Sequence, residues 1–277
     1  MNDKPKCSGA GRSDRSAPEI PLPGGIANHG QVVRVGNTVR RPQRSWGDAT
    51  QALLLHLETV GFTGAPRFLG VDSQGREVLS YIPGTAALEP YPKWVLTDEA
   101  LVSAADLIRS YHDAASTFDP SPYFWGRSPP DGFKGQIVTH NDLKPDNVIF
   151  RDGRAVGLID FDLASPGSRA WDIACAARQW APLRPDIYIS DPRRARKLER
   201  FRLLVDTYGM DDSDRLKVAE GVGLNYTWFY QLIETSAASG HGPFSKLWST
   251  KTRPRAALTM RWHAENRVNL RVALGIN

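Results

Sequence analysis

Residues 140–147 read HNDLKPDN and residues 159–162 read IDFD, with a hairpin pattern between them. A proline three residues after Asp142 closes a tight turn, so Asp142 and Asn147 are expected to face one cavity. The hairpin, built around an Asp-Gly turn, then doubles the chain back. We therefore expect Asp160 to return beside Asn147, so that three oxygen-bearing side chains converge.

This set of side chains suits phosphoryl transfer, a reaction in which the protein does little covalent chemistry. The reaction needs a carboxylate that orients the attacking hydroxyl, oxygen ligands for magnesium, and positive charge near the phosphates. Magnesium prefers hard ligands such as carboxylate and amide oxygens. Asp142, Asn147 and Asp160 supply the oxygens. Lys144 supplies positive charge for the nucleotide phosphates. Each residue alone is also typical of a solvated loop or turn, but the joint spacing favours phosphoryl transfer.

The pattern H-x-D-x-x-x-x-N followed by I-D-F-x resembles the catalytic core of the eukaryotic-protein-kinase-like superfamily. Within it, the chain is most similar to the aminoglycoside phosphotransferase (APH) family of small-molecule kinases, also called the phosphotransferase enzyme family. The resemblance implies that Asp142 is the catalytic base and that Asn147 and Asp160 bind Mg²⁺. It implies that His140 braces the loop. It also implies ATP or GTP as the phosphoryl donor and a small hydroxyl compound as the acceptor.

A protein kinase is the nearest alternative, because HNDLKPDN is close to the HRDLKPxN of that class. Protein kinases, however, place a long activation segment ending in Ala-Pro-Glu between the metal-binding aspartate and the next large helix. Here only twelve positions separate Asp160 from Asp172 (172 − 160), which favours a small-molecule acceptor over a peptide. Asp172 either braces the catalytic loop or caps the helix that begins there.

The first part of the chain has the patterns of a small mixed lobe, predicted to span residues 19–84. A hairpin pattern, a helical pattern capped by Asp48 and two strand patterns lead to a break at Pro83-Gly84. The predicted elements are strands at 31–36 and 38–41, a helix at 48–60, and strands at 67–71 and 77–82. Residues 1–18 are predicted to form a disordered leader.

Helical patterns dominate from residue 85 to residue 277. Thr97 is a predicted N-cap, because Asp98 and Glu99 follow it in the first turn, where they complement the helix dipole. Further helices are predicted at 170–180, 193–208, 213–235 and 255–274, and one hairpin at 148–150 and 155–159. The expected fold class is α+β. It is a bilobal protein-kinase-like fold with a small antiparallel-sheet N-terminal lobe that holds one helix, and a larger, mainly helical C-terminal lobe.

The nucleotide is expected between the lobes. No Walker A sequence occurs, so the nucleotide would lie under the first hairpin, against the segment that joins the lobes. Backbone groups of Tyr81 and Ile82 in that segment are the predicted contacts to the base. Residues 22–28 form either a glycine-rich cover or a plain loop.

Two departures from the family pattern concern the residues that would bind the nucleotide phosphates. The family's phosphate-binding lysine on the third strand is absent, and Arg40 is predicted in that role, with Arg41 as the second choice. The family's partner glutamate on the first helix is also absent, since only Asp48 and Glu58 flank that helix. These departures leave a second hypothesis open, in which the chain is a catalytically weak or inactive binding or immunity protein with a kinase fold.

Composition limits the other partners. The formal charge of +5 favours anionic partners such as a nucleotide, and it also fits a solvated surface. No basic run is interleaved with aromatic residues, so we expect no nucleic-acid partner. No apolar stretch has the length of a membrane helix. The two cysteines, Cys7 and Cys175, do not make a disulfide framework, which favours a reducing, cytoplasmic location.

The acceptor is not identified by the sequence. Aminoglycosides are polycations, and an enzyme that binds them needs a carboxylate-lined pocket. The C-terminal part of this chain is instead rich in lysine and arginine. The candidate acidic lining residues, for which solvated surface positions are the simpler interpretation, are Asp186, Asp191, Glu234 and Glu265. The sequence therefore predicts only a small hydroxyl compound.

Overall fold

The computed structural model describes residues 17–24 and 30–276. Most of the predicted leader, 1–18, and most of the predicted cover, 22–28, therefore lie outside the described residues. Within the described ranges, no helix is both long enough and apolar enough to cross a membrane.

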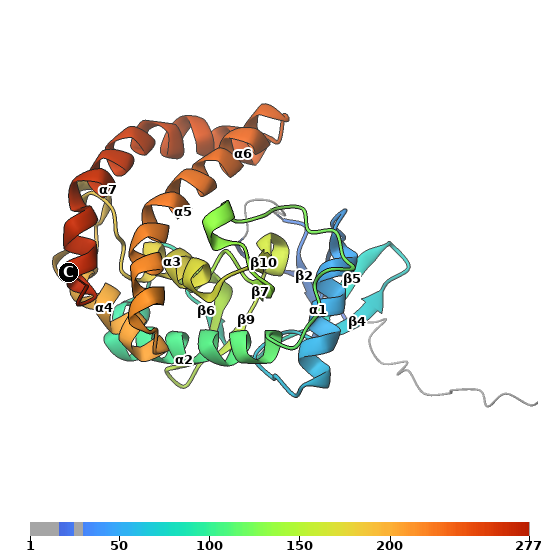
Figure 1. Ribbon diagram of the computed structural model, residues 1–277. Helices are drawn as coiled ribbons and strands as arrows, with labels where there is room; N and C mark the ends of the chain where they lie inside the picture. The colour runs from blue at the N-terminus through green and yellow to red at the C-terminus, as the bar shows by residue number, and fades with distance from the viewer. Residues whose placement is uncertain (1–16, 25–29, 277) are drawn as a thin grey trace, which may run out of the picture.

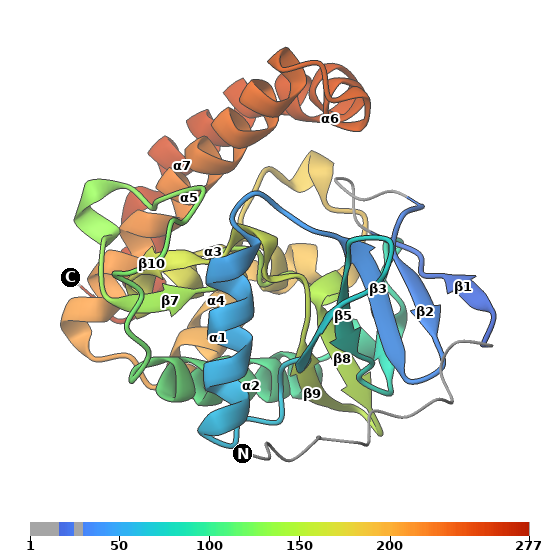
Figure 2. The same cartoon turned by 90° about the vertical axis from the view of Figure 1, so that its right-hand side faces the viewer.

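A five-stranded antiparallel sheet forms the N-terminal part of the structure (Figure 2). Its strands, in their order across the sheet, are β1 (Glu19–Pro21), β2 (Val33–Val35), β3 (Thr38–Pro42), β5 (Arg76–Ser80) and β4 (Phe68–Val71). The predicted hairpin is confirmed, because β2 and β3 pair directly across a two-residue turn. Gly36 has a φ of +59° in this turn, a conformation that glycine adopts without steric cost.

Helix α1 (Gly47–Thr59) packs beside this sheet (Figure 2). Its apolar residues recur at helical spacing, and Leu53 and Leu57 are fully buried. The prediction that Asp48 caps the helix is wrong: the N-cap is Trp46, whose side chain makes no capping bond, and Asp48 lies in the first turn. A carboxylate in the first turn still interacts favourably with the helix dipole.

The remainder of the structure is mainly helical (Figure 1). Its α-helices are α2 (Asp98–Ala115), α3 (Arg169–Trp180), α4 (Lys197–Tyr208), α5 (Asp212–Ala238), α6 (Gly242–Leu247) and α7 (Arg253–Ala273). The connecting 3-10 helices are Lys93–Leu96, Asp131–Phe133, Pro145–Asn147, Phe161–Leu163, Asp186–Tyr188 and Pro192–Arg196, and a π-helix spans Trp248–Thr252. The predicted cap of α2 is confirmed, since Thr97 Oγ1 accepts a hydrogen bond from the N–H of Ala100 at 3.3 Å. Helix α5 leads up to α6, and α7 returns beside α5 (Figure 1).

Two small antiparallel sheets hold the loops between α2 and α3. One consists of β6 (Thr85–Ala86), β8 (Val148–Arg151) and β9 (Arg154–Leu158), and in the other β7 (Ile137–Thr139) pairs with β10 (Ser165–Gly167). The β8–β9 hairpin confirms the prediction. Strands β7 and β10 were not predicted, because three residues are too few to show an alternating pattern. Their pairing places residue 140 directly after a fixed strand.

One hydrophobic core lies beneath these loops. Leu57 of α1, Ile108 of α2 and Phe161 belong to the same buried cluster. Trp180 of α3 is fully buried there, and its Nε1 donates a hydrogen bond to the backbone oxygen of Leu143 at 3.0 Å. The core therefore packs against the loop from below and holds its backbone in place.

We predict that Gly84→Ala lowers the free energy of unfolding by about 1–3 kcal/mol, because backbone strain of this kind has that size. Gly84 has a φ of +149°, and an added Cβ would lie 2.5 Å from the backbone oxygen of Phe150. Thermal and denaturant unfolding would measure the change. The matched control is Gly132→Ala, whose Cβ would meet nothing within 4 Å. Equal stability of the two variants would contradict the assignment.

Candidate active site

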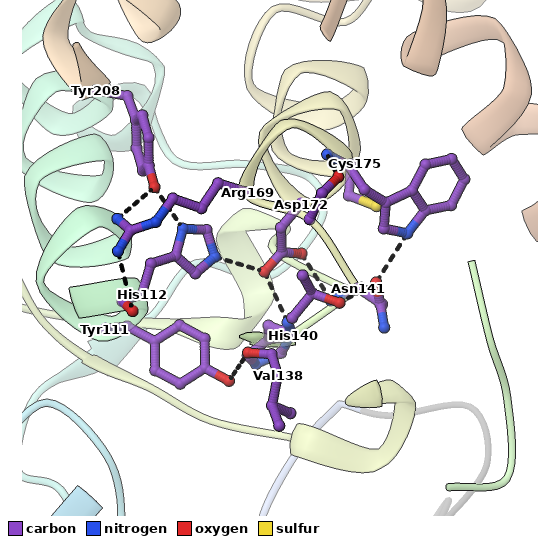
Figure 3. Close-up of polar contacts among 12 residues, drawn as sticks. Tyr111, His112, Val138, His140, Asn141, Arg169, Asp172, Cys175 and Tyr208 are labelled. Carbon is purple, nitrogen blue, oxygen red and sulfur yellow. Dashed lines mark hydrogen bonds and ion pairs between the residues drawn. The ribbon is translucent and has the colours of Figure 1, made fainter. Parts of the chain in front are cut away.

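The loop that follows β7 is anchored by one buried carboxylate, that of Asp172 on α3 (Figure 3). Asp172 is fully buried, and its two oxygens accept hydrogen bonds from the backbone N–H groups of His140, at 2.7 Å, and Asn141, at 2.8 Å. His112 of α2 approaches the same carboxylate, with Nε2 at 3.0 Å. Of the two interpretations left open by the sequence, bracing is confirmed, since the N-cap of α3 is Ser168.

Asn141 is a site residue that the sequence analysis missed. Its φ of +65° is left-handed, a conformation that asparagine tolerates better than most residues. Its Nδ2 donates to the backbone oxygen of Leu163 at 2.7 Å and to Ser165 Oγ at 2.9 Å. Its Oδ1 accepts from Nε1 of Trp171 at 2.9 Å (Figure 3). An asparagine between two positions of the motif was the available signal, because such a residue suits a left-handed turn.

His140 lies inside the loop and connects its two halves. The ring is fully buried, and its Nε2 lies 3.0 Å from the backbone oxygen of Ile159. The backbone N–H of Asp142 donates to His140 Nδ1 at 3.3 Å. His140 therefore holds the loop against the end of β9, which is the bracing position that the family resemblance implied.

Asp142, Lys144 and Asn147 converge on one point. Asp142 is buried, and its Oδ2 lies 3.0 Å from Lys144 Nζ and accepts a hydrogen bond from Asn147 Nδ2 at 2.9 Å. Burial works to raise the pKa of Asp142, but the charge and hydrogen bond of Lys144 outweigh burial and hold the pKa below its usual value. The carboxylate is therefore ionised at neutral pH.

Asp160 is brought to the same place by the hairpin. The backbone N–H of Ile159 donates to the backbone oxygen of Asn147 at 2.9 Å, so the residue after Ile159 emerges beside the loop. Asp160 has a left-handed φ of +66°, and the residue is half-buried. Its pKa is raised, because burial and the neighbouring Asp162 outweigh the attraction of Arg41 and Lys144. The positive charges near Asp160 therefore do not fully offset its burial and the charge of Asp162.

Asn147 and Asp160 carry oxygen atoms of the kind that magnesium binds. Among the described residues, no three His, Cys, Asp or Glu side chains form a metal-binding group. The predicted site therefore depends on Asn147 and Asp160 alone, which suits Mg²⁺ because it keeps several waters and binds substrate phosphates. Asn147 Nδ2 already donates to Asp142, so its Oδ1 is the amide atom available to a cation. A cation would also supply the charge that Asp160 lacks.

The structure places Arg41, and not the first choice Arg40, at this cluster. Arg41 is buried, forms an ion pair with Asp162, and has Nη1 3.6 Å from Asp160 Oδ1. Arg40 extends to Asp72 instead, with Nε 3.7 Å from the carboxylate. Successive side chains of a strand point to opposite faces, so only one of two neighbouring arginines faces the cluster. Which of the two arginines reaches the cluster therefore depends on which face of β3 its side chain occupies.

The carboxylate partner that was missing from the first helix comes from the sheet. Glu77 of β5 lies directly opposite Arg41 of β3, and its Oε2 is 2.9 Å from Arg41 Nε. Gln51 of α1 donates to Glu77 at 3.3 Å. Burial raises the pKa of Glu77, against the attraction of Arg41. Helix α1 thus contributes the amide of Gln51, and strand β5 contributes the negative charge of Glu77. Pairing the two predicted strands in register would have revealed this ion pair.

The linker residues Tyr81 and Ile82 lie between the sheet and the β8–β9 hairpin. The backbone N–H of Tyr81 already donates to Asn37 at 2.9 Å, and its ring lies under the guanidinium of Arg34 at 3.9 Å. Ile82 packs on Gly157, where an added Cβ would lie 2.8 Å from Ile82 Cδ1. The predicted contact of this linker with a nucleotide base therefore cannot use the N–H of Tyr81.

Comparisons with known proteins agree with this arrangement. Residues 124–203 match the model of the phosphotransferase enzyme family, APH. A trifolitoxin immunity protein from Rhizobium leguminosarum bv. trifolii is 34% identical over 211 residues, which cover 71% of this chain and 76% of that protein. The chain belongs to the phosphotransferase enzyme family. A homoserine kinase from Zymomonas mobilis subsp. mobilis is 36% identical over 72 residues, only 21% of its own length.

Solved structures show the same kinase-like fold as this phosphotransferase-family chain. A choline/ethanolamine kinase family protein from Mesorhizobium loti superposes with a TM-score of 0.62, at 16% identity and with 94% of each chain covered. The GDP complex of a mutant aminoglycoside 2'-phosphotransferase-IIIa superposes with a TM-score of 0.59, at 16% identity, covering 94% of this chain and 96% of that one. The α+β, protein-kinase-like fold class is confirmed.

A cavity of about 800 Å³ adjoins the loop, and no residue of the five-stranded sheet lines it. Lys144 and Asp146 line it from the loop, and the other lining residues come from Glu89 onward in the chain. Of the four candidate acidic residues, only Asp191 lines it. Its basic residues are Lys144, Arg178, Arg184, Arg193, Lys251 and Arg255, and its acidic residues are Glu89, Asp146 and Asp191. The cavity of this family member is thus basic overall.

We predict that Asp172→Asn lowers the free energy of unfolding by about 2–3 kcal/mol, because hydrogen bonds to a buried charge have this size. Amide hydrogen exchange at His140 and Asn141 should accelerate, since an amide NH₂ cannot accept from one of the two N–H groups. The control is Asp113→Asn, whose half-exposed carboxylate pairs with Arg169 at the surface. Unchanged exchange at both amides would show that Asp172 is not the anchor.

Proposed function

We propose that this chain is a small-molecule kinase that transfers the γ-phosphoryl group of ATP or GTP to a hydroxyl of a small acceptor. The observation that carries the proposal is the convergence of an ionised carboxylate, Asp142, with Lys144 and with Asn147. Membership of the phosphotransferase enzyme family supports it. The structural neighbour in complex with GDP supports a nucleotide as donor.

Asp142 is the proposed catalytic base. Its carboxylate accepts hydrogen bonds from two side chains and keeps one position for an incoming hydroxyl, which it orients and whose proton it accepts. Lys144 beside it is the proposed contact to the transferred phosphoryl group, where it offsets negative charge. Asn147 and Asp160 would hold Mg²⁺, which when bound supplies positive charge to the phosphates.

The nucleotide is proposed to lie between residues 19–84 and residues 85–277, beside the linker residues Tyr81 and Ile82. Arg41 then occupies the position from which a cation reaches the phosphates, and Glu77 fixes its guanidinium. The acceptor is proposed to enter the basic cavity on the opposite side of the loop, because Lys144 lines that cavity while pairing with Asp142. Donor and acceptor would thus approach the loop from opposite sides.

We predict that Asp142→Asn reduces turnover by about 10²–10⁴-fold and leaves the fold intact, since it removes the proton acceptor without a change of shape. The assay is magnesium-dependent consumption of ATP or GTP in a screen of small hydroxyl acceptors. The control is Asp152→Asn in the exposed β8–β9 turn, a left-handed position that asparagine tolerates. Turnover of Asp142→Asn within a few-fold of the unaltered chain would defeat the proposal.

We predict that removing Arg41 weakens nucleotide binding at least about tenfold, the effect of losing one charge-assisted contact to phosphate. The variant is Arg41→Gln combined with Glu77→Gln, so that the buried carboxylate of Glu77 is not left unpaired. Arg40→Gln is the control on the opposite face of β3. Calorimetric titration with Mg·ADP would measure both. A loss for Arg40→Gln as large as for the Arg41 variant would refute the assignment of Arg41.

A second candidate function is non-catalytic immunity by ligand binding. It is favoured by the relative named a trifolitoxin immunity protein, which the chain matches over 71% of its length. Expression in sensitive bacteria, challenged with a panel of antibiotics, separates the two functions. Protection that survives Asp142→Asn would support binding alone, whereas protection that this substitution abolishes would support phosphoryl transfer.

A further inference from the structure

Arg178 of α3 is a buried arginine that packs on aromatic rings and, within the described residues, has no polar partner. Its residue exposure is 4%, and its guanidinium lies 4.1 Å from the ring centre of Phe229 and 5.4 Å from that of Tyr226. Among residues 17–24 and 30–276, it has no hydrogen bond and no ion pair, and its Nε is sealed from solvent without any acceptor. The guanidinium lines the basic cavity beside the catalytic loop.

The other buried arginines show how unusual this is. Within the described residues four arginines are buried, and each of the other three has a carboxylate partner. Their ion pairs are Arg41 with Glu77 at 2.9 Å, Arg193 with Asp191 at 2.9 Å and Arg200 with Asp98 at 2.7 Å. An unpaired buried charge is strongly destabilising, so a buried arginine needs an anion. Among the described residues no carboxylate forms an ion pair with Arg178, and the charge of Asp142 acts on it only without direct contact.

A second unsatisfied polar group lines the same cavity. Tyr226 is 4% exposed, and its hydroxyl has no hydrogen-bond partner among the described residues. Buried tyrosine hydroxyls normally find one. Two buried groups that both can donate hydrogen bonds, one of them charged, therefore face one cavity, and no acceptor for either lies among the described residues.

Each acidic residue that lines the rest of the cavity already has a partner within the chain. Asp191 is held by Arg193 through two hydrogen bonds, and Glu89 pairs with Lys251 at 3.3 Å. Asp146 accepts the hydroxyl of Tyr91 at 2.8 Å. A polycation would meet a net positive surface here, whereas an anion would meet unpaired donors.

We propose that this cavity selects an acceptor that carries an anionic group, a carboxylate or a phosphate ester, bound by Arg178 and Tyr226. The position of the acceptor's hydroxyl, at Asp142, rests on the function proposed above. Lys144 lines the cavity and pairs with Asp142, so an acceptor held at Arg178 reaches the catalytic loop. The nucleotide is not the anion meant, because no residue of the five-stranded sheet lines this cavity.

The test uses the full chain and three probes that share a hydroxymethylbenzene frame and differ in charge. They are para-hydroxymethyl benzoate, benzyl alcohol and para-hydroxymethyl benzylammonium, titrated by calorimetry without nucleotide or metal. We expect the anion to bind at least about tenfold more tightly than the neutral and cationic probes, as one charge-assisted hydrogen-bonding contact would give. Para-hydroxymethyl phenyl phosphate, measured alongside, distinguishes a phosphate ester from a carboxylate as the better anion.

The matched variant is Arg178→Met, which keeps an apolar stem on Phe229 and removes the charge. We expect the anion preference to disappear and the melting temperature to rise, because an unpaired buried charge is removed. A purely structural role for Arg178 predicts a lower melting temperature instead. Arg202→Met on α4 is the control, since that arginine is largely exposed, pairs with Asp206 and lies outside the cavity. It should retain the anion preference.

Tyr226→Phe provides an independent second variant, which removes only the hydroxyl and should weaken anion binding several-fold. Equal binding of all three probes, or an anion preference that survives both Arg178→Met and Tyr226→Phe, would overturn the proposal. So would a loss of ADP affinity in Arg178→Met as large as the loss for the anionic probe. Anion-selective binding without phosphoryl transfer to any acceptor would uphold this inference and reject the kinase function, because the binding assay contains no nucleotide.

Discussion

The geometry of the site depends on the carboxylate of Asp172. It lies on α3, thirty residues or more from the groups it binds, and it fixes two successive backbone N–H groups of the loop at 2.7 and 2.8 Å. A buried carboxylate needs such donors, and a loop in this conformation needs an acceptor for them, so each satisfies the other. His112 completes the set from α2. Three segments are thereby held at one point, and the side chain of Asp142 emerges next to it.

Backbone strain is stored on both sides of this anchor. Asn141 and Asp160 both have left-handed φ angles, which cost of order 1–3 kcal/mol for a residue other than glycine. The hydrogen bonds of the Asn141 side chain to Leu163 and Ser165 offset that cost within the loop. Around Asp160 the ion pair with Arg41 has this role. The strained conformations turn two neighbouring segments toward each other, which a relaxed strand or helix could not do.

The parts of the fold that the sequence predicted are those with local causes. The β2–β3 and β8–β9 hairpins, and the cap of α2 at Thr97, follow from a few adjacent residues, and the structure has all three. What the sequence did not reveal depends on tertiary contacts. The choice between Arg40 and Arg41 requires the face of β3, and the partner Glu77 lies on a strand that pairs with it only after folding. The pairing of β7 with β10 has the same origin.

The excess charge around the loop differs in sign between the side of the five-stranded sheet and the side of the helices. On the sheet side, three carboxylates, Asp160, Asp162 and Glu77, face two arginines, Arg41 and Arg44, which suits a cation with its phosphates. On the helical side the excess is positive, and Arg178 faces it unpaired. The two surfaces come from different elements and can be altered independently. A protein that had lost turnover would still keep the basic cavity, so an immunity function by binding and a kinase function would share one ligand chemistry. Of these two functions, only the kinase function requires the carboxylate of Asp142.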